Sequence, residues 1–580
     1  MSRNAEVASR FEEMADLLEA QDVEYKPRSY RRAAENVRGH PDPIEDLAAE
    51  GEDALDDIEG VGESIAAKVI EYVETGKVER IEEAREELPV DMAGLTSVEG
   101  VGPKTVGDLY EHLGITTLDE LEAAAREGRI QAVPGYGEKS EANILAGIDF
   151  ARQSGERELL GDARPIGEEA VEYLVAGDAV SACELGGSLR RWRETIGDVD
   201  VLAAAEAHAA VVERLLDWDR VTEEMESGTT KASVRVGDLR VDLRVVDPHE
   251  WGSALVYFTG SKDHNVRLRN HAIAREMKVN EYGVFDVSGV EAGEDDTRAG
   301  ERVAGDTEAD VYAALDLAWM PPELREDNGE IDAAADGSLP DLVDPDELRG
   351  DLHVHTDWSD GGHSIEEMVV GATEFGHDYV CISDHAEGPG VVGGAGLSDE
   401  DLREQRAEIE AVAESAEITV FAGVEANVEA DGVISVGDDV LEELDVVVAS
   451  PHSGLDGDGT ERLIAAVEHP EVDVLGHPSG RLLNQRPGMT FDVESVAEAA
   501  ADNGVALEVN ANPHRLDLWG EAVRVAVGTG ASVVVNTDAH RPGDYAYARY
   551  GVHTARRGWA ETADVVNTRD VGGLHAALSI

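Results

Sequence analysis

Three aspartates in the middle of the chain have the spacing of a two-metal site. Asp198 and Asp200 alternate with valines in the run 197–202, so they share one face of a strand while the valines face the core. A second alternating run, 240–245, places Asp242 on its polar face. Three carboxylates that meet on a sheet repel one another unless cations neutralise them. Two Mg²⁺ or Mn²⁺ ions about 4 Å apart would do so and would support transfer of a phosphoryl group. The alternative, solvated acids at a strand edge, stays open in so acidic a protein.

The segment before these aspartates has residues suited to holding phosphates. Gly187 permits close backbone approach, Ser188 offers a hydroxyl, and Arg191 supplies positive charge. We therefore predict that these three residues bind a nucleotide. This pattern by itself is typical of many nucleotidyltransferases.

The last part of the chain has a second set of candidate ligands. Apolar runs recur between helical stretches, which indicates a parallel sheet or barrel, and the ends of parallel strands meet at one mouth of a barrel. A lone histidine at a strand end is more often structural, but nine imidazoles and carboxylates favour a metal centre. Mixed nitrogen and oxygen ligands favour Zn²⁺, Mn²⁺ or Fe²⁺ over Mg²⁺. The nine residues are His353, His355, Asp360, His385, Glu425, His452, His477, Asp538 and His540.

Pairs of glycines flank one apolar residue at three places near the N-terminus. The pairs are Gly60 with Gly62, Gly100 with Gly102, and Gly135 with Gly137, and each precedes a helical pattern. Such a turn exposes backbone N–H groups at a helix N-terminus, which is an anion site. The repeated pattern resembles helix-hairpin-helix elements, which bind DNA phosphates without reading sequence. Plain turns between helices are the alternative.

The composition sets limits on the setting and the partners. The chain has 580 residues, 42% hydrophobic and 30% charged, which predicts several globular domains. It has no apolar run of membrane-spanning length and only two cysteines, Cys183 and Cys381, so we expect a reduced, cytoplasmic setting. The net charge of −76 argues at first against DNA. Scarce lysine and widespread acids instead predict adaptation to a saline cytosol, where salt screens self-repulsion.

The first 325 residues resemble family-X DNA polymerases in the order of their motifs. Tyr257-Phe258-Thr259-Gly260 with Asn265 is similar to the family's nucleotide-binding segment. The resemblance implies that this segment packs on the deoxyribose and that Asn265 contacts the incoming nucleotide. The run 60–77 is similar to the family's lyase domain, which implies a Schiff-base role for Lys68; a surface lysine that contacts phosphate is the alternative. Arg240 is a further expected DNA contact.

Residues 348–580 resemble the polymerase-and-histidinol-phosphatase (PHP) domain, a distorted (β/α)₇ barrel with up to three metal ions. The resemblance implies that the nine residues named above are its ligands, and that Arg515 clamps a phosphate of DNA. The expected order is a lyase-like helical domain (1–80), further helix-hairpin-helix elements (81–150), an α+β nucleotidyltransferase palm (151–250), a thumb (251–325), an acidic linker (326–347) and the PHP barrel (348–580).

The combined prediction is a monomeric DNA-directed polymerase that fills gaps during repair with dNTPs. A metal-dependent 3′–5′ exonuclease or 3′-end phosphodiesterase would act in the same chain, and 5′-deoxyribose-phosphate lyase activity is a further expectation. One rival is a phosphatase of small monoesters whose N-terminal half docks on DNA. A second rival is a scaffold for DNA ends without catalysis.

Overall fold

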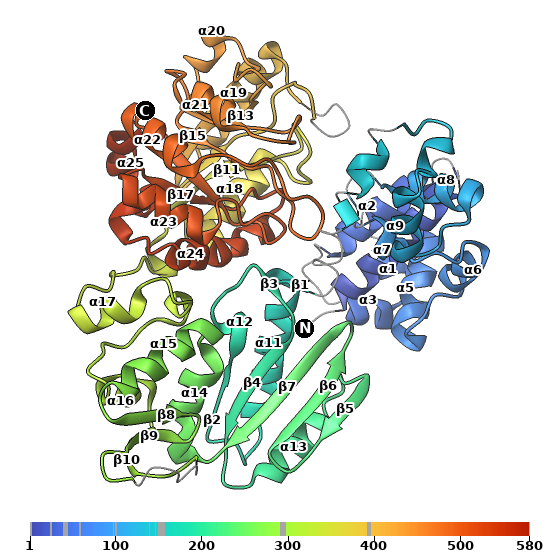
Figure 1. The fold of residues 1–580 in the computed structure, drawn as a ribbon. Helices are drawn as coiled ribbons and strands as arrows, with labels where there is room; N and C mark the ends of the chain where they lie inside the picture. The colour runs from blue at the N-terminus through green and yellow to red at the C-terminus, as the bar shows by residue number, and fades with distance from the viewer. Residues whose placement is uncertain are drawn as a thin grey trace. The chain divides into compact units, whose positions relative to one another are not determined.

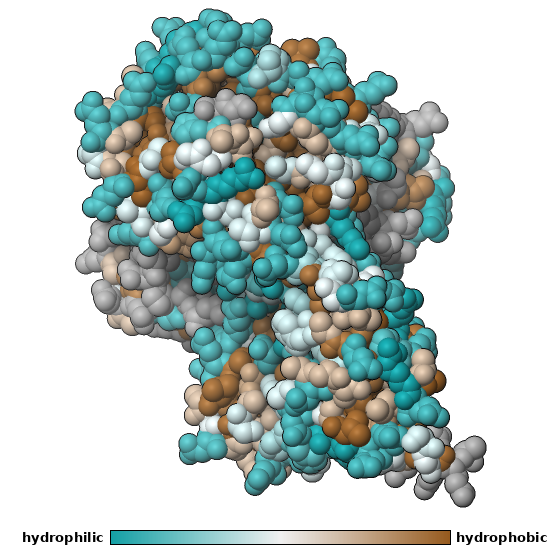
Figure 2. Space-filling model, turned by 90° about the vertical axis from the view of Figure 1, so that its left-hand side faces the viewer, coloured by the Kyte–Doolittle hydropathy of each residue, from teal (hydrophilic) through white to brown (hydrophobic). Residues whose placement is uncertain are grey.

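A computed structural model of the chain describes residues 3–21, 23, 26–38, 44–56, 58, 60–96, 98, 101–137, 140–145, 147–148, 157–290, 297–390 and 396–578. These residues form two compact units. One comprises Met1–Glu156 with Leu482–Pro487, and the other comprises Arg157–Arg481 with Gly488–Ile580. No helix in these ranges is both long enough and apolar enough to cross a bilayer. On the face drawn in Figure 2, hydrophilic residues cover most of the surface, as the net charge of −76 predicts.

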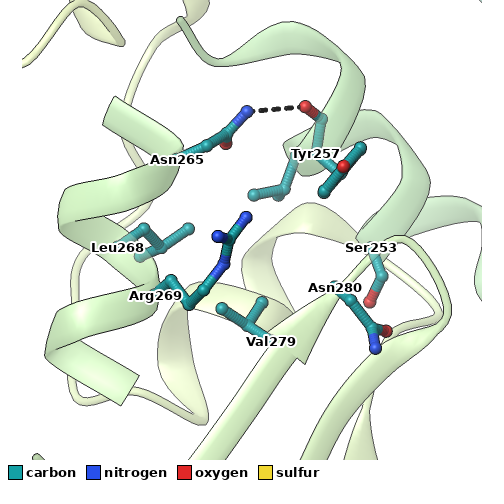
Figure 3. Close-up of a pocket in the computed structure, with 8 residues that line it drawn as sticks. Ser253, Tyr257, Asn265, Leu268, Arg269, Val279 and Asn280 are labelled. Carbon is teal, nitrogen blue, oxygen red and sulfur yellow. Dashed lines mark hydrogen bonds between the residues drawn. The ribbon is translucent and has the colours of Figure 1, made fainter. Parts of the chain in front are cut away.

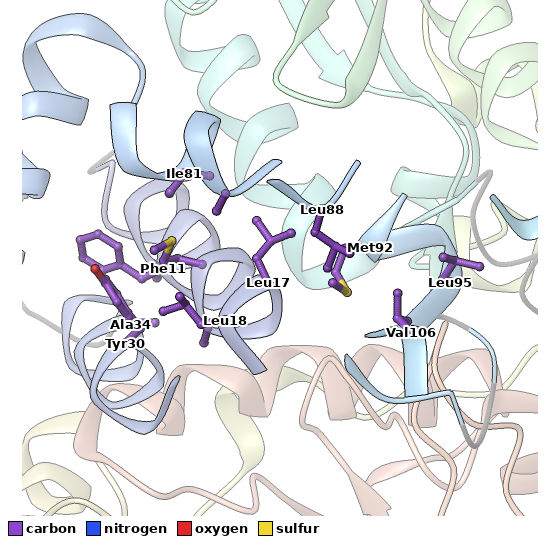
Figure 4. Packing of buried hydrophobic residues seen from close by; sticks show 14 of the residues in the cluster. Phe11, Leu17, Leu18, Tyr30, Ala34, Ile81, Leu88, Met92, Leu95 and Val106 are labelled. Atoms are coloured by element: carbon purple, nitrogen blue, oxygen red, sulfur yellow. The ribbon is translucent and has the colours of Figure 1, made fainter. Parts of the chain in front are cut away.

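The N-terminal unit is helical and packs around its first helix. Phe11, Leu17 and Leu18 of α1 (Asn4–Ala20) enter one buried cluster with residues of the surrounding helices (Figure 4). The ring of Phe11 lies 5.9 Å from that of Tyr30 on α2. The other helices are α2 (Lys26–Arg38), α3 (Ile44–Glu50), α4 (Glu52–Leu55), α5 (Glu63–Thr75), α6 (Glu79–Glu87), α7 (Met92–Thr96), α8 (Pro103–Leu113) and α9 (Leu118–Arg126).

The three glycine turns share one hydrogen-bond pattern. In each, the residue between the glycines donates its N–H to the carbonyl three positions earlier: Val61 to Ile58 at 3.0 Å, Val101 to Val98 at 2.9 Å, and Tyr136 to Val133 at 3.2 Å. Gly62 and Gly102 are the residues before α5 and α8. Positive φ angles of 78° at Gly60 and 93° at Gly135 require glycine there. Gly100 lies outside the described residues.

The palm is a five-stranded sheet in the order β2-β4-β7-β6-β5 (Figure 1). The neighbours β4 and β7 are parallel, and the other neighbouring pairs are antiparallel. The strands are β2 (Ala182–Leu185), β4 (Val199–Ala204), β5 (Glu223–Ser227), β6 (Lys231–Val236) and β7 (Leu239–Val246), with helices α11 (Leu160–Val175), α12 (Gly187–Arg190) and α13 (His208–Leu216) and the short pair β1 (Glu158–Leu159) and β3 (Thr195–Ile196).

The thumb has its own small core and extends past residue 325. Two helices, α14 (Trp251–Thr259) and α15 (Lys262–Ile273), are followed by an antiparallel sheet of β8 (Met277–Asn280), β9 (Gly283–Asp286) and β10 (Glu301–Ala304), then α16 (Glu308–Ala313). The expected linker contains α17 (Glu330–Asp336), whose Ile331 and Ala334 enter the thumb core. The expected acidic linker therefore contains an ordered helix, whose apolar face the exposed acidic positions masked in the sequence.

The C-terminal part is a nearly closed barrel of seven parallel strands, in sequence order. A bridge between Val354 and Ala539 joins the first strand to the segment after the last. The strands are β11 (Gly350–Val354), β12 (Tyr379–Ile382), β13 (Thr419–Asn427), β14 (Val446–Ser450), β15 (Val474–Leu475), β16 (Ala506–Asn510) and β17 (Val533–Asn536). The helices are α18 (Ile365–Phe375), α19 (Asp399–Ala413), α20 (Asp438–Leu441), α21 (Thr460–Val467), α22 (Val493–Asn503), α23 (Gly520–Thr529), α24 (Ala548–Arg557) and α25 (Val571–Leu578). The predicted barrel is confirmed.

Candidate active sites

The palm sheet brings the three predicted aspartates together. Strands β4 and β7 are parallel neighbours, and Asp200 lies opposite Asp242 in their register. One oxygen atom from each of these residues and from Asp198 lies within 4.8 Å of the other two. Val199 and Val201 are fully buried on the opposite face, so the alternation read from the sequence places every one of these side chains correctly.

The electrostatics of this trio favour a divalent cation. Burial, and next the charges of Asp198 and Asp242, raise the pKa of Asp200 to about 7. Arg240, an expected DNA contact, donates from Nε to Oδ1 of Asp242 at 2.9 Å. Arg240 and Arg191 together do not neutralise three carboxylates, and divalent ions would remove the remaining repulsion. The donor set, carboxylate oxygens alone, suits Mg²⁺ or Mn²⁺.

Gly187 lies directly against the aspartates and has no room for a side chain. A Cβ atom there would stand 2.0 Å from Oδ2 of Asp200, and the φ angle of +54° is one that other residues rarely adopt. Gly187 begins the one-turn helix α12, which also contains Ser188. Glycine is required at position 187 because the backbone there closely approaches the carboxylate of Asp200.

Arg191 lies at the same site but already has protein partners. Its Nε donates to Oε1 of Glu326 at 2.9 Å, and its Nη1 donates to the carbonyl of Thr259 at 2.6 Å. Its charge is among those that lower the pKa of Asp200 against the effect of burial. Arg191, the predicted phosphate contact, is therefore held beside the aspartates by the nearly buried carboxylate of Glu326.

The predicted nucleotide-binding segment forms the junction of α14 and α15. Tyr257 and Phe258 lie in the last turn of α14, Gly260 follows this helix, and Asn265 lies in α15. The Asn265 amide donates to the carbonyls of Tyr257 at 2.8 Å and Gly260 at 3.1 Å, which ties the two helices together. Figure 3 shows Tyr257 and Asn265 lining a small pocket, which is completed by Ser253, Val256, Leu268, Arg269, Val279 and Asn280. Phe258 does not line this pocket; its ring lies under the guanidinium of Arg244, 4.9 Å away.

All nine predicted PHP ligands meet at one end of the barrel, around Glu425. Both carboxylate oxygens of this fully buried residue face imidazole nitrogens, at 2.6–3.7 Å. The imidazoles belong to His353, His355, His385, His452 and His477. Asp538 adds an oxygen 3.1 Å from Nε2 of His355, and Asp360 lies 3.3 Å from His540.

Three overlapping groups among these residues have the spacing of metal sites. In each group the candidate ligand atoms lie within 4.8 Å of one another: His355, Asp360, His385 and His540; His353, His355 and Glu425; His385, Glu425 and His452. Buried nitrogen and oxygen atoms without a hydrogen-bond partner concentrate here, at His353, His355, His385, Glu425, His452 and His477. Because buried polar atoms are normally satisfied, these orphaned atoms fit bound cations. Positive φ angles at His477 (22°) and Asp538 (55°) show that the backbone is strained to present two of the ligands.

Without cations, the centre pairs its own charges. Burial lowers the pKa of His385, but Glu425 and Asp360 outweigh it and raise the pKa to about 10. Burial raises the pKa of Glu425, but the surrounding imidazoles, His452 and His385 first, outweigh it and hold the pKa well below its usual range. Metal binding at this centre must therefore displace protons from histidine.

Two supporting residues were missed in the sequence. Nδ1 of His353 lies 2.7 Å from Oε1 of Glu508, whose other oxygen accepts from the backbone N–H of His477 at 2.7 Å. Nδ1 of His452 lies 2.6 Å from Oδ1 of Asn427. Such contacts fix the orientation of a metal-binding imidazole. Glu508 could have been noticed in the sequence, because it is an acid inside the apolar run 505–509 and a buried carboxylate needs a buried partner.

Arg515, the predicted phosphate clamp, lies at the same mouth of the barrel. Its Nε is 3.3 Å from Oδ2 of Asp538, and a fifth of its side chain is exposed. The guanidinium thus combines access to solvent with a position beside the ligand cluster.

Lys68 lies on α5, the helix after the first glycine turn. Its Nζ donates to the Ser64 carbonyl at 2.6 Å and to the Ser64 hydroxyl at 3.0 Å. Burial lowers its pKa, while Glu71 opposes the change. A lowered pKa increases the fraction of free amine, which a nucleophilic lysine requires.

The fold and the two sites define a class of enzyme: a nucleotidyltransferase palm with helix-hairpin-helix elements, joined to a metal-dependent phosphoesterase barrel. Matching protein families follow the same order. Residues 2–78 match the helix-hairpin-helix domain, 92–149 the SAM-like helix-hairpin-helix tandem, 254–326 the DNA polymerase beta thumb, and 351–512 the PHP domain.

Curated relatives extend this agreement to the whole chain. The chain is 35% identical to the DNA polymerase/3′-5′ exonuclease PolX of Bacillus subtilis (strain 168) over 564 residues, 96% of each protein. It is 26% identical to DNA polymerase lambda of Rattus norvegicus over 56% of each chain. A probable phosphatase of Caldanaerobacter subterraneus, TTE1963, is 30% identical over 33% of this chain and 77% of its own. The chain therefore belongs to the family-X DNA polymerases that have a C-terminal PHP domain.

Proposed function

We propose that this enzyme fills gaps in DNA and removes or cleans 3′ ends within one chain. Asp198, Asp200 and Asp242 would hold two Mg²⁺ or Mn²⁺ ions, which when bound activate the primer 3′ hydroxyl and offset charge on the leaving pyrophosphate. The observation that supports the polymerase half is the convergence of three carboxylates at β4 and β7, beside the closely approaching backbone of Gly187.

The remaining polymerase residues would bind and orient the substrates. Ser188 and Arg191 would contact the dNTP phosphates, and Tyr257 and Asn265 would line the place of its sugar and base. The Phe258 ring, which lies under the Arg244 guanidinium, would stabilise this segment. Gly260 has no side chain, so α14 and α15 can approach each other closely there. Arg240 would exchange Asp242 for the primer backbone once cations occupy the site, because the cations would then neutralise that carboxylate.

The helical unit would bind the DNA backbone without reading its sequence. Gly60, Gly62, Gly102, Gly135 and Gly137 would present backbone N–H groups to phosphates near the starts of helices, and Gly100 is expected to act in the same way. In so acidic a protein these neutral donors allow phosphate binding with few lysines. Binding should consequently depend on salt less steeply than in a protein with many phosphate-contacting cations.

The PHP barrel would act as a 3′–5′ exonuclease or 3′-end phosphodiesterase. Its nine ligands would hold up to three Zn²⁺, Mn²⁺ or Fe²⁺ ions, which when bound supply an activated water and offset charge on the phosphate. Arg515 would orient the scissile phosphate from the rim, and Glu508 would keep His353 in the ligating orientation. The Bacillus subtilis relative is named as a DNA polymerase/3′-5′ exonuclease, which supports this assignment.

One pair of substitutions separates the two activities. On gapped, end-labelled DNA with dNTPs and Mg²⁺ or Mn²⁺ in molar KCl, Asp200→Ala should abolish primer extension and leave 3′ degradation intact. His353→Ala should do the reverse. Full activity of both variants in both assays would overturn the assignment.

A second candidate is supported by the resemblance of the barrel to a probable phosphatase. A PHP centre that acts on small phosphate monoesters should hydrolyse a histidinol-phosphate-like substrate at a rate that single-stranded DNA does not inhibit. A nuclease should show competition by DNA.

The lyase function rests on Lys68. It would form a Schiff base with the 5′-deoxyribose phosphate left after base removal, and Ser64 would hold the amine. Borohydride should trap wild-type enzyme on such DNA and should fail to trap Lys68→Ala. Equal trapping of both proteins would refute the role of this lysine.

A further inference from the structure

The predicted phosphate-binding arginine is joined to the PHP barrel through one carboxylate oxygen. Arg557, at the end of α24, donates from Nη1 to the backbone carbonyl of Arg191 at 3.1 Å and to Oε1 of Glu326 at 3.2 Å. The same Oε1 accepts from Nε of Arg191 at 2.9 Å. The three side chains are nearly buried, with 4%, 12% and 11% exposed for Arg557, Glu326 and Arg191.

Arg191 and Arg557 both stabilise the charged form of Glu326. Burial raises its pKa, but Arg191 and Arg557 outweigh this effect and lower it. A buried charge that loses a partner is strongly destabilised, so removal of Arg557 would leave Glu326 with Arg191 and the more distant Arg193, 3.7 Å away, and would favour a different geometry. Loss of Arg557 would therefore free the backbone carbonyl of Arg191 and weaken the restraint on Glu326, and the Thr259 carbonyl would remain as the second partner of the Arg191 guanidinium.

We propose that Arg557 and Glu326 are positioning residues for DNA synthesis: the PHP barrel holds Arg191 in the orientation in which it meets the dNTP phosphates. This inference rests on the proposed function, in which Arg191 contacts those phosphates. The barrel thereby contributes to the polymerase site although its own ligands lie elsewhere.

The same helix offers a matched control. Arg556 donates from Nε to Oε1 of Glu323 at 2.6 Å and from Nη1 to the Val343 carbonyl at 2.8 Å. These contacts also join the barrel to the thumb at Glu323 and to the later segment at Val343, but they involve neither Arg191 nor Glu326. Loss of Arg556 therefore tests docking in general, whereas loss of Arg557 tests the positioning of Arg191.

The experiment measures dNTP KM and kcat of the full-length chain on gapped DNA. Arg557→Gln should raise KM by about fivefold or more, the lower end of typical couplings between sites, with a smaller change in kcat. Arg557→Lys should restore part of the loss, and Arg556→Gln should leave KM within about twofold. Degradation of 3′ ends and metal content should match wild type in every variant, which shows that the barrel is intact.

A second variant approaches the contact from the other side. Glu326→Gln leaves the barrel sequence unchanged and removes the negative charge that both arginines share, so it should raise KM to a similar extent. The double variant should be no worse than either single one, because residues of one network are not additive.

Three results would overturn the inference: an unchanged KM in Arg557→Gln, a lowered KM in Glu326→Gln, or equal effects of Arg557→Gln and Arg556→Gln. The second result would mean that Glu326 restrains Arg191 rather than presenting it. Failure of the wild-type chain to incorporate dNTPs would overturn the proposed function as well, and is distinguished by the absence of any KM to compare.

Discussion

Replacing Asp200 with asparagine should stabilise the metal-free protein and abolish synthesis. Burial and two neighbouring carboxylates raise the pKa of Asp200 from an ordinary 3.8 to about 7. At about 1.4 kcal/mol per pH unit, the ionised carboxylate costs the fold about 4 kcal/mol at pH 8. Asparagine has nearly the same shape and no charge, so it removes this cost while it fits beside Gly187.

The pH dependence gives the sign of the effect. An acid whose pKa is raised on folding binds more protons in the folded state, so wild-type stability falls as pH rises from about 4 to about 7. The advantage of Asp200→Asn should be small at pH 4, about 1–2 kcal/mol at pH 5, and complete above pH 7. In calorimetry with EDTA at constant KCl, the unfolding midpoint at pH 8 should rise on the order of 5 °C.

Bound cations should reverse the order of the two unfolding midpoints, so that wild type becomes more stable than Asp200→Asn. With Mn²⁺, the wild-type midpoint should rise because the metal binds only the folded state, and Asp200→Asn should gain less. Primer extension by the variant should fall by about 100-fold or more, since the ions supply several kcal/mol to the transition state. Asp219→Asn, which removes an exposed acid of the same sheet domain, is the charge control. Equal midpoints for wild type and Asp200→Asn at pH 8, or a difference that does not change with pH, would refute the repulsion on which the metal assignment depends.

Three further predictions address the supporting structure. Glu508→Gln should weaken Mn²⁺ binding by the barrel by about 10- to 100-fold in a titration, because His353 loses the carboxylate that orients it; unchanged affinity would exclude this role. Gly187→Ala should destroy synthesis but spare 3′ degradation, since its methyl group would collide with Asp200 and its φ angle costs about 1–2 kcal/mol; normal extension would contradict the close approach. Asp473→Asn should raise the unfolding midpoint above pH 7 but not at pH 4, because burial raises the pKa of this acid to about 7; a gain that is equal at both values would point to another cause.

The family, the convergence of the three palm aspartates and the clustering of the nine candidate ligands were predictable because their signals are local. Alternation along a strand decides which side chains share a face, so Asp198 and Asp200 could be paired before any fold was known. A histidine or acid at the end of each apolar run could be assigned to one barrel mouth, because parallel strands leave no other arrangement. Repeated glycine pairs marked the three turns through the same local rule.

Contacts between distant segments needed the tertiary structure. Glu508 supports His353 across 155 positions, and Arg557 reaches Arg191 across 366. Apolar positions spaced along α17 were hidden by the surrounding acids, so its packing on the thumb became visible only with the core in place. The types of residue near each site follow from strand periodicity, whereas their partners depend on which helices and strands pack together, and a buried charge identifies its partner only after the chain has folded around it.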